Sequence, residues 1–503
     1  MFRMGLLAAL RSRSKESSAI GLMITASHNA EPDNGVKLID PMGEMLDQRW
    51  ESIATELVNV PNSALQEQLD KIVMFSGANV TSPALVFVGR DTRPSGPHLS
   101  EASITGVEAY SGKVVDFGIV STPMLHYFVA LHNSTQSENE PQPDHLRTAY
   151  FNKLSLSFID LQKGQTTSGN YSAELDFDGA NGVGAIIMKE FSKHIGSKLK
   201  VNVYNDSTDV RGKLNYMCGA DYVKTNQKAP EGLPRIPNRR CVSVDGDADR
   251  IVYFYTDADG KFHLLDGDRI ATLVASYLMD LVRESGLSIE LGLVQTAYAN
   301  GNSTRYIAEM LKIPVACVST GVKHLHHRAL DYDIGVYFEA NGHGTIVFSS
   351  KAKQIIAKAV KDEKAAMRLE RVVDVINETV GDALSDMFLV ESILAARGWN
   401  LSDWEAAYTD LPSRMLKVVV KDRNLVQTTD AERKCTAPAG LQRAIDELVK
   451  ETPYGRAFVR PSGTEDIVRV YAEASTQEAA DLLATKVAQA VFDLSGGVGT
   501  KPN

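Results

Sequence analysis

Cysteine is scarce in this sequence. Only four cysteines occur in 503 residues, and they are far apart, at Cys218, Cys241, Cys317 and Cys435. No two of them have the C-x-x-C spacing that is typical of zinc and dithiol sites, so a disulfide framework and a structural zinc site are both disfavoured. This usage is typical of a reducing compartment, and we expect a cytoplasmic protein.

Long apolar runs and an excess of positive charge are also absent. No hydrophobic stretch reaches the roughly 18 residues that a membrane span requires, so we expect no membrane partner. The formal net charge of −10 argues against nucleic acid as the main partner. An anionic small molecule would therefore have to be held by a local group of Arg, Lys and backbone N–H donors. Residues 1–11 superficially resemble a signal peptide, but their apolar part is short, and we expect the first helix of a domain.

Apolar segments and helical patterns alternate along the chain. Strands are predicted at residues 84–90 and 113–118, with helices near 97–110 and from 122, and the pattern restarts at 172–178 and 291–296. This alternation favours mostly parallel, doubly wound sheets. Further predictions are a hairpin of 251–255 with 262–265, a helix from about 267, a surface loop at 132–145, amphipathic helices in 352–405, and a small α+β domain that begins near 416.

Three aspartates follow directly on the predicted strand at 241–244. Asp245, Asp247 and Asp249 alternate with the small residues Gly246 and Ala248. Alternating side chains of an extended strand point to opposite faces, so the three carboxylates converge only if the backbone curls around a point. Converging carboxylates repel one another unless a cation lies between them, and oxygen ligands suit Mg²⁺ or Ca²⁺.

Two other interpretations of this acidic segment compete with a metal site. A calcium-binding EF-hand loop also begins D-x-D-x-D, but its Gly and Glu positions are filled here by Arg250 and Thr256. An acidic surface turn is the second alternative, and residues 257–260 have that character. We favour Mg²⁺ with open coordination positions that a phosphate oxygen completes.

A serine follows the apolar run at 20–26, which is predicted to be a buried strand. Ser27 would then lie at the carboxyl end of a strand, where α/β proteins place ligand sites. His28 beside it and Lys37 further on could handle protons or anions. The G-x-S-x-G motif is missing, so this is no hydrolase nucleophile elbow. A capped loop without a chemical role is the alternative.

Four further motifs were considered. The Gly-rich turn at 179–184 lacks the G-x-G-x-x-G spacing, so we predict a packing role. The histidines at 324, 326 and 327 have no second ligand cluster, and surface positions are favoured over a metal site. Residues 339–344 place polar side chains on a Gly-rich loop, which suits sugar hydroxyls. Residues 460–465 combine Arg, Ser, Thr and a Gly turn, which are the elements of a phosphate clamp; a plain turn is the alternative.

The order and type of four loops resemble the α-D-phosphohexomutase superfamily: residues 25–29, 245–250, 339–343 and 460–464. The third loop usually reads G-E-x-S-G-H in glucose- and mannose-directed members. Here it reads Phe338-Glu-Ala-Asn-Gly-His-Gly, which is similar to the phosphoacetylglucosamine mutase branch. Residues 320–327 and 460–466 are also similar to that branch, and the resemblance covers essentially the whole chain.

The resemblance implies the fold class and the domain organisation. We expect an α/β protein with three doubly wound α/β domains and a smaller C-terminal α+β domain. The domains are expected at residues 1–170, 171–288, 289–411 and 412–503, and they carry, in order, the phosphoserine, metal, sugar and phosphate loops.

The resemblance also implies an isomerase that interconverts N-acetylglucosamine 6-phosphate and N-acetylglucosamine 1-phosphate, in UDP-N-acetylglucosamine biosynthesis. The reaction would pass through a phosphoserine and a bisphosphate intermediate, with a sugar bisphosphate as primer and one Mg²⁺ per chain. The chain is expected to be a monomer or a weak homo-oligomer. The implied catalytic residues are Ser27, His28, Lys37 and Arg250. The implied metal ligands are Asp245, Asp247, Asp249 and Ser27 with its phosphoryl group. The implied sugar ligands are Glu339, Asn341 and His343, and the implied phosphate ligands are Arg460, Ser462, Gly463 and Thr464.

Two departures from the family pattern leave alternatives open. Family members carry an upstream segment that ends in G-T-A-G-F-R, whose arginine reaches the active site, and this sequence begins after that segment. A sugar-phosphate-binding form with impaired catalysis is therefore one alternative, and a glucose- or mannose-directed mutase is the other. The serine loop of the family commonly reads T-A-S-H-N-P, whereas Ala30 replaces the proline here; we expect little effect.

Overall fold

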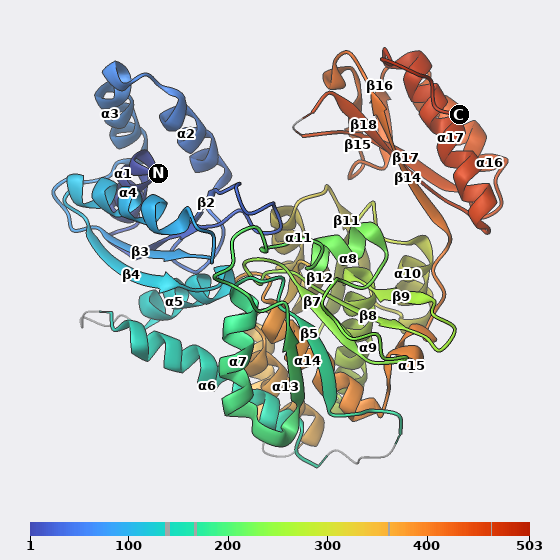
Figure 1. Cartoon of the computed structure of the whole chain (residues 1–503), viewed down its shortest axis with the longest axis horizontal. Coiled ribbons are helices and arrows are strands. Elements are labelled where there is room, and N and C mark those ends of the chain that lie inside the picture. Colours follow the sequence, from blue (N-terminus) through green and yellow to red (C-terminus); the bar gives the residue numbers. More distant parts are fainter. Residues whose placement is uncertain (136–140, 165–168, 361–362, 464) are drawn as a thin grey trace. The chain divides into compact units, whose positions relative to one another are not determined.

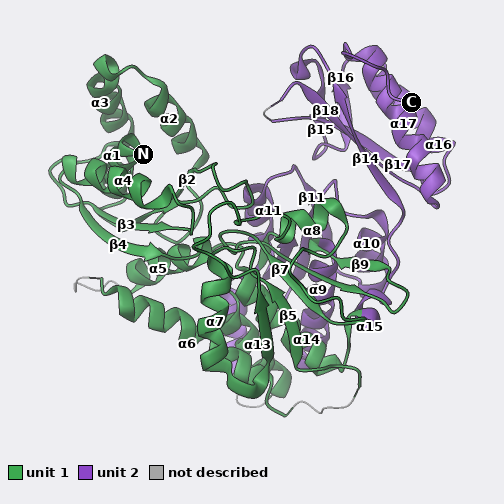
Figure 2. Ribbon diagram, viewed as in Figure 1, with its two compact units in different colours: residues 1–267, 341–345, 359–401 green, residues 268–340, 346–358, 402–503 purple. Residues whose placement is uncertain are grey.

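A computed structural model of the chain describes residues 1–135, 141–164, 169–360, 363–463 and 465–503 (Figure 1). The chain forms two compact units (Figure 2). Unit 1 comprises Met1–Gly267, Asn341–Thr345 and Ala359–Leu401, and unit 2 comprises Asp268–Ala340, Ile346–Lys358 and Ser402–Asn503. Within the described ranges, no helix is both long enough and apolar enough to cross a membrane.

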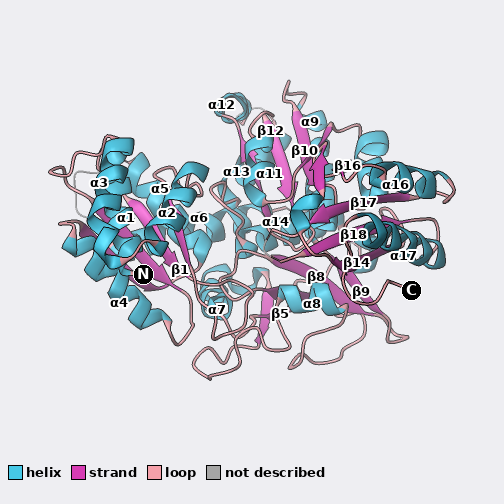
Figure 3. Cartoon of the chain, turned by 90° about the horizontal axis from the view of Figure 1, so that it is seen from above, coloured by secondary structure: helices cyan, strands magenta, loops and turns pink. Residues whose placement is uncertain are grey.

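The first sheet of unit 1 has the strand order β2-β1-β3-β4. β1, β3 and β4 are parallel, and the short edge strand β2 runs antiparallel to β1. Helices flank these strands (Figure 3). The strands are β1 (Ile20–Ile24), β2 (Val36–Ile39), β3 (Leu85–Arg90) and β4 (Lys113–Ile119), and the helices are α1 (Phe2–Ser14), α2 (Gln48–Asn59), α3 (Leu65–Ser76), α4 (Gly96–Ala109) and α5 (Thr122–Ser134).

Both faces of this sheet are covered, because side chains of successive strand residues point to opposite sides. Leu22 and Val88 belong to the core that includes α1 and α4, whereas Phe87 packs on the α5 side, with Phe117 beside it. α1 crosses α4 at two glycines: a Cβ on Gly5 would lie 2.0 Å from a carbonyl oxygen of α4. The expected first helix is therefore a core element of the domain.

The second sheet of unit 1 has the order β6-β5-β7-β8-β9. Its first three strands are parallel, and the predicted hairpin of β8 and β9 adds two antiparallel strands. The strands are β5 (Glu174–Asp178), β6 (Lys200–Tyr204), β7 (Cys241–Val244), β8 (Ile251–Thr256) and β9 (Phe262–Leu265). The remaining helices of unit 1 are α6 (Pro143–Leu161), α7 (Val183–Ile195), α8 (Ala220–Asn226), α13 (Lys364–Val375) and α14 (Ala383–Arg397).

Two expectations about this unit were wrong. The predicted surface loop at 132–145 is partly helical, because α5 continues to Ser134 and α6 begins at Pro143; residues 136–140 lie outside the described residues. The expectation of amphipathic helices in 352–405 was wrong only for α14, which is buried from Ala383 to Ala395; α12 and α13 each bury one face, as expected. A helix that is surrounded by other elements needs no polar face.

Unit 2 contains one α/β sheet and a smaller antiparallel part. β10 is parallel to β11 and β12 in the order β11-β10-β12-β13. The C-terminal sheet β14-β18-β17 is antiparallel, and β15 and β16 form a separate hairpin. The strands are β10 (Leu291–Thr296), β11 (Val315–Val318), β12 (Ile334–Phe338), β13 (Gly344–Phe348), β14 (Ser413–Val419), β15 (Gln427–Thr429), β16 (Lys434–Ala437), β17 (Arg456–Pro461) and β18 (Ile467–Glu473). The helices are α9 (Gly267–Ser285), α10 (Gly301–Arg305), α11 (Val322–Ala329), α12 (Ser350–Ala359), α15 (Leu401–Glu405), α16 (Leu441–Lys450) and α17 (Gln477–Leu494).

The α/β class is confirmed. Three sheets have parallel central strands with helices around them, and the last part of the chain is a smaller α+β structure whose core lies between β14, β17, β18 and the helices α16 and α17.

Candidate active site

The turn between β7 and β8 gathers three buried carboxylates. Asp245, Asp247 and Asp249 are 0%, 0% and 3% exposed, and each offers an oxygen that lies within 4.8 Å of the others. Gly246 is required here, because a Cβ at this position would lie 2.7 Å from the carbonyl oxygen of Ser27. The backbone therefore curls as the alternating sequence predicts.

Backbone amides donate hydrogen bonds that stabilise this turn, and they belong to the turn itself and to the start of helix α14. One oxygen of Asp245 (Oδ1) accepts from the amides of Asp249 and Arg250, both at 3.1 Å. The Ala248 carbonyl accepts from the amide of Ala383 at 3.1 Å, at the start of the buried helix α14. The fold fixes the turn before any ligand arrives.

Ser27 lies directly beside this carboxylate cluster. Its Oγ donates a hydrogen bond of 2.6 Å to Asp245 Oδ2, and the residue is 8% exposed. Its amide donates to the Thr25 hydroxyl at 2.9 Å, and Thr25 in turn donates to Asp91 at 2.7 Å. Ser27 has a φ of 50°, in the left-handed region that serine rarely adopts, so its neighbours must impose this conformation.

Arg93 is the main residue that imposes it. This arginine is 1% exposed and pairs with Asp91 at 3.0 Å. Its NH2 donates to the carbonyls of Ser27 and Asn29, at 2.9 and 3.0 Å. Asn215 donates to the same two carbonyls at the same distances. Sequence reasoning missed Arg93 and Asn215, although a charged D-x-R segment at the end of a buried strand is a signal for Arg93.

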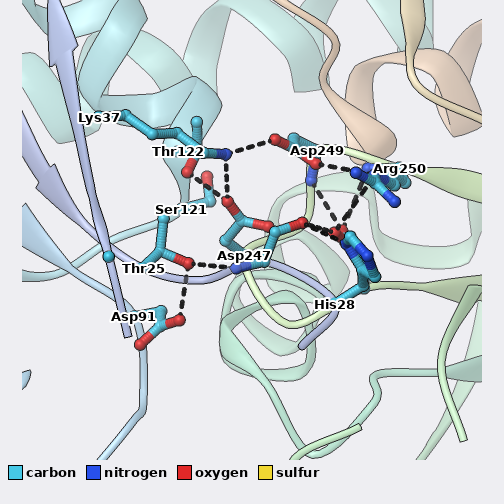
Figure 4. A network of polar contacts seen from close by, with 12 residues as sticks. Thr25, His28, Lys37, Asp91, Ser121, Thr122, Asp247, Asp249 and Arg250 are labelled. Atoms are coloured by element: carbon cyan, nitrogen blue, oxygen red, sulfur yellow. Dashed lines mark hydrogen bonds and ion pairs between the residues drawn. The ribbon is translucent and has the colours of Figure 1, made fainter. Parts of the chain in front are cut away.

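Lys37 binds the carboxylate cluster from β2. Its Nζ donates to Asp247 Oδ2 and to Asp249 Oδ2, both at 2.8 Å (Figure 4). The Thr122 hydroxyl donates to the same Asp247 oxygen at 2.6 Å. Burial would lower the pKa of Lys37, but the two carboxylates outweigh burial and raise it above its ordinary value. Lys37 is therefore a permanent cation at this site.

On its other side the cluster lacks hydrogen-bond donors among the described residues. Asp247 Oδ1 and Asp249 Oδ1 are buried and have no hydrogen-bond partner among the described residues. Burial, with the Asp249 and Asp247 carboxylates nearby, raises the pKa of Asp245 well above its ordinary value. Unpaired buried carboxylate oxygens are costly unless a cation binds them. The candidate ligand atoms are all oxygens, and two of them have no hydrogen-bond partner among the described residues. The cluster therefore fits Mg²⁺.

Arg250, His28 and His343 surround the same cluster. Arg250 Nε lies 4.0 Å from Asp245 Oδ2 and 3.9 Å from Asp249 Oδ1. His28 Nδ1 is 3.5 Å from the Ser27 hydroxyl, and burial, with Arg250 nearby, lowers the pKa of His28. His343 Nδ1 is 3.4 Å from Asp249 Oδ1. The structure thus brings together seven of the expected catalytic and metal residues, and it adds His343, which was expected to bind sugar.

The other candidate residues divide between the two units. Asn341 is in unit 1, where its Oδ1 accepts from the His343 amide at 2.9 Å. Glu339 is in unit 2, and its Oε1 accepts from the Gly321 amide at 3.2 Å. Arg460, Ser462 and Gly463 are also in unit 2, at and just beyond the end of β17. Thr464 lies outside the described residues.

Arg460 has an acidic partner that sequence reasoning missed. Its Nε donates to Glu432 Oε1 at 2.8 Å. Glu432 lies in the turn of the β15–β16 hairpin, and nothing in the local sequence marks it as functional.

The three histidines of α11 are not all at the surface. His324 and His327 are exposed, as expected. His326 is half-buried, and its Nδ1 lies 3.0 Å from the Tyr337 hydroxyl. In the part of the chain that the structure describes, only the Asp245 cluster gathers His, Cys, Asp or Glu side chains closely enough to hold a metal.

Four family models match the chain and together span most of it. "Phosphoglucomutase/phosphomannomutase, alpha/beta/alpha domain I" matches residues 7–63 and 59–147. "Phosphoacetylglucosamine mutase AMG1, domain II" and "domain III" match residues 149–252 and 266–399. The "Phosphoglucomutase/phosphomannomutase, C-terminal domain" matches residues 415–490.

Individual proteins are similar over the whole chain. The phosphoacetylglucosamine mutase of Sus scrofa is 53% identical, and the match covers 100% of this chain and 92% of the relative; the Homo sapiens protein is 51% identical with the same coverage. A crystal structure of the Aspergillus fumigatus N-acetylphosphoglucosamine mutase, in complex with GlcNAc-6P and magnesium, has a TM-score of 0.93. That structure is 46% identical, and the match covers 98% of this chain and 92% of the other.

Proposed function

This chain belongs to the phosphoacetylglucosamine mutase family, and from that premise we propose that it interconverts N-acetylglucosamine 6-phosphate and N-acetylglucosamine 1-phosphate, as an isomerase that serves UDP-N-acetylglucosamine synthesis. The observation that carries the proposal is the Ser27 hydroxyl, 2.6 Å from a buried cluster of three carboxylates. A serine in that position is suited to carry a phosphoryl group beside a divalent cation.

Ser27 is the proposed phosphoryl carrier. Its strained backbone and the hydrogen bonds from Arg93 and Asn215 to its carbonyl hold the hydroxyl in one place. Phosphoryl transfer requires mainly alignment of the two oxygens and neutralisation of charge. A fixed hydroxyl at the edge of a polar cluster meets the first requirement.

Asp245, Asp247 and Asp249 are the proposed protein ligands of one Mg²⁺, and a phosphoryl oxygen on Ser27 completes the set. When bound, the ion neutralises charge that develops on the transferring group. Lys37 holds the second oxygens of Asp247 and Asp249, so the other oxygen of each would be available to a metal ion. A sugar bisphosphate serves as the primer that charges Ser27.

Two histidines are suited to move protons in the transfer. The acceptor hydroxyl of the sugar must lose a proton when it attacks the phosphoryl group, and Ser27 needs one when it leaves. His28 lies 3.5 Å from Ser27 Oγ, and its lowered pKa keeps it neutral near pH 7. His343 Nε2 is buried without a hydrogen-bond partner among the described residues. Lys37 and Arg250 supply positive charge.

Binding of the substrate is proposed to involve the loops at 339–343 and 460–464. Glu339, Asn341 and His343 would bind sugar hydroxyls, since carboxylate, amide and imidazole groups offer both acceptors and donors. Arg460, Ser462, Gly463 and Thr464 would hold the phosphate that is not transferred. We place one of these loops in each of four domains, at 1–170, 171–288, 289–411 and 412–503. The four matching family models support a division into four, and three of the expected domains each contain one α/β sheet.

The proposed function also includes a compartment and an oligomeric state. The four cysteines are all free thiols, which is typical of a reducing compartment, and we place the chain in the cytoplasm. We propose that it works as a monomer or a weak homo-oligomer on small phosphosugars, without nucleic acid or membrane partners.

A coupled assay on the purified chain tests the function. It would supply N-acetylglucosamine 6-phosphate, Mg²⁺ and a trace of sugar bisphosphate, with glucose 6-phosphate in a parallel reaction. We expect conversion with a clear preference for the acetylated sugar. Ser27→Ala should reduce kcat by roughly 10³-fold or more, because it removes the nucleophile.

Ser157→Ala is the matched control, because this buried serine of unit 1 binds only a carbonyl of its own helix. It should leave kcat unchanged. If Ser27→Ala retained more than about a hundredth of the activity with an unchanged melting temperature, Ser27 would not be the phosphoryl carrier.

A further inference from the structure

The turn of the β15–β16 hairpin has an unusual backbone. Asp430, Ala431 and Glu432 have φ values of 53°, 54° and 68°. Each is in the left-handed region, where residues other than glycine, asparagine and aspartate are disfavoured, so Ala431 and Glu432 are the strained positions. Three such residues in succession persist only if their surroundings fix them, and strain of this kind gathers at functional sites.

The side chain of Glu432 is the part of this turn that its surroundings hold. Its Oε1 accepts from Arg460 Nε at 2.8 Å. Its Oε2 accepts from the Thr320 amide at 3.0 Å and from the Thr320 hydroxyl at 2.6 Å. The strained turn therefore places one carboxylate between a loop that follows β11 and the end of β17, all within unit 2.

The donors around Glu432 form an oxyanion site. A guanidinium, a backbone N–H and a hydroxyl converge on one anion, which is the set of donors that proteins use for phosphate. In this structure the anion is a side chain of the same protein. The pair is not sealed from solvent, since the Glu432 and Arg460 side chains are 15% and 22% exposed, so another anion can reach it.

We propose that Glu432 is an internal competitor for the phosphate of the substrate at Arg460. This inference rests on the proposed function, in which Arg460 holds the phosphate that is not transferred. A phosphate dianion carries more charge than a carboxylate, so it can displace Glu432 from Arg460. When the phosphate leaves, Glu432 returns, and the half-buried guanidinium is not left without a counter-charge.

This competition would serve the step in which the bisphosphate turns around. One phosphate must leave Arg460 before the other can take its place. A carboxylate that pairs with Arg460 after one phosphate leaves and before the other binds lowers the free-energy cost of the exchange. The same pairing lowers the affinity of Arg460 for the substrate. A purely orienting role for Glu432 predicts the opposite effect on affinity, because removing its charge would then loosen Arg460.

Glu432→Gln separates the two roles by the direction of the change in KM. The amide keeps the shape of the side chain but removes its charge. We expect KM for N-acetylglucosamine 6-phosphate to fall roughly five- to tenfold, since charge competition at an ion pair is of this size. We expect kcat to fall as well, because phosphate then leaves Arg460 more slowly. An unchanged or higher KM would overturn the proposal.

Asp430→Asn is the matched control. It removes a charge from the same turn, asparagine tolerates the left-handed backbone, and Asp430 pairs with the exposed Arg433 rather than with Arg460. KM should stay at the wild-type value. A KM that fell equally in both variants would assign the effect to the net charge of the hairpin and overturn the role of Glu432.

Binding of inorganic phosphate to the full chain tests the role of Glu432 without relying on turnover of the substrate. Calorimetry should show that Glu432→Gln binds phosphate roughly five- to tenfold more tightly than the wild type, and Arg460→Ala should abolish this gain. Amide exchange at residues 430–433 should speed up in the wild type when phosphate is added. Equal affinity in wild type and Glu432→Gln would overturn the inference even if the wild type converts substrate. Absence of conversion by the wild type would instead overturn the proposed function.

Discussion

Buried carboxylates occur in both units, but their hydrogen bonds are completed in opposite ways. In unit 2, Glu473 is 1% exposed and accepts from Arg456, from the Gly301 amide and from the Tyr471 hydroxyl, at 2.9–3.1 Å. In unit 1, Asp247 and Asp249 are similarly buried, yet one oxygen of each has no donor among the described residues.

This difference separates a structural carboxylate from one that awaits a ligand. Glu473 joins β18 to the start of α10 and to Arg456, and every bond it makes is within unit 2. The cost of its burial is therefore offset inside the fold. The cost at the Asp245 cluster is only partly offset by Lys37, and the remainder has to be met by a cation. Glu432 is intermediate, because it is fully bonded but reachable from solvent.

Among the changes to carboxylates, Asp247→Asn should have the largest effect on activity and a small effect on stability. It removes a charge that Mg²⁺ requires, so kcat should fall by roughly 10³-fold. It also removes a repulsion between buried carboxylates, so the metal-free melting temperature should stay the same or rise. An activity assay over a Mg²⁺ titration, with melting curves in chelator, measures both.

Asp259→Asn is the control for that change, because Asp259 lies in the exposed acidic turn after β8. Added Mg²⁺ should raise the melting temperature of the wild type and of this control, but not of Asp247→Asn. If Asp247→Asn melted much lower than the wild type in chelator, the cluster would be a structural element like Glu473.

Glu473→Gln should show the reverse pattern. The amide cannot satisfy the Arg456 guanidinium and the Gly301 amide together, so the free energy of unfolding should fall by about 2–4 kcal/mol. The kcat of the folded protein should stay within about twofold, because Glu473 touches no residue of the proposed site. Chemical denaturation followed by circular dichroism, together with the coupled assay, measures these effects.

Glu447→Gln removes an exposed charge pair with Arg443 in the same unit, and it should have no measurable effect on stability. A loss of kcat in Glu473→Gln without a loss of stability would contradict the structural role of that carboxylate.

The acidic turn could be predicted from the sequence because the residues that form it are neighbours in the chain. Asp245, Asp247 and Asp249 alternate with small residues directly after an apolar strand, so their convergence follows from strand geometry. The position of Ser27 at the end of β1 follows from the same reasoning. The α/β alternation likewise yields the class of fold, since each strand and helix carries its own periodicity.

Residues whose partners are distant in sequence were harder to predict. Lys37 was singled out, but its segment was not read as a strand, and its partners Asp247 and Asp249 lie more than two hundred residues away. Arg93 acts through backbone carbonyls of another segment, so its D-x-R segment alone does not show which groups it binds. Glu432 lies in a turn without glycine, so no turn signal marks it.

The burial of helix α14 could not be predicted from the sequence of the helix. Its residues look like part of an amphipathic series, and only the elements packed around it show that almost all of its surface is buried. Burial of a helix depends on what covers it, and that is settled by tertiary structure rather than by the helical period.

Lowering the pH tests whether one histidine in each unit changes the stability of the protein in the same way. Burial lowers the pKa of His126 in unit 1 to about 4, and burial with His327 nearby lowers the pKa of His326 in unit 2 to about 4. The unfolded chain takes up these protons near pH 6.5, whereas the folded chain resists them until about pH 4. The stability that each neutral histidine contributes is therefore present above pH 6.5 and is lost as the pH falls toward 4.

His126→Asn should flatten this acid dependence. Asparagine can still donate to the Gly43 carbonyl, which His126 Nδ1 contacts at 2.7 Å, but it cannot take up a proton. Its free energy of unfolding should fall about 2 kcal/mol less than that of the wild type between pH 6.5 and 5. The exposed His98 provides the control, since His98→Asn makes the same change of side chain at the surface. The same slope in His126→Asn and wild type would mean that unit 1 does not hold His126 neutral.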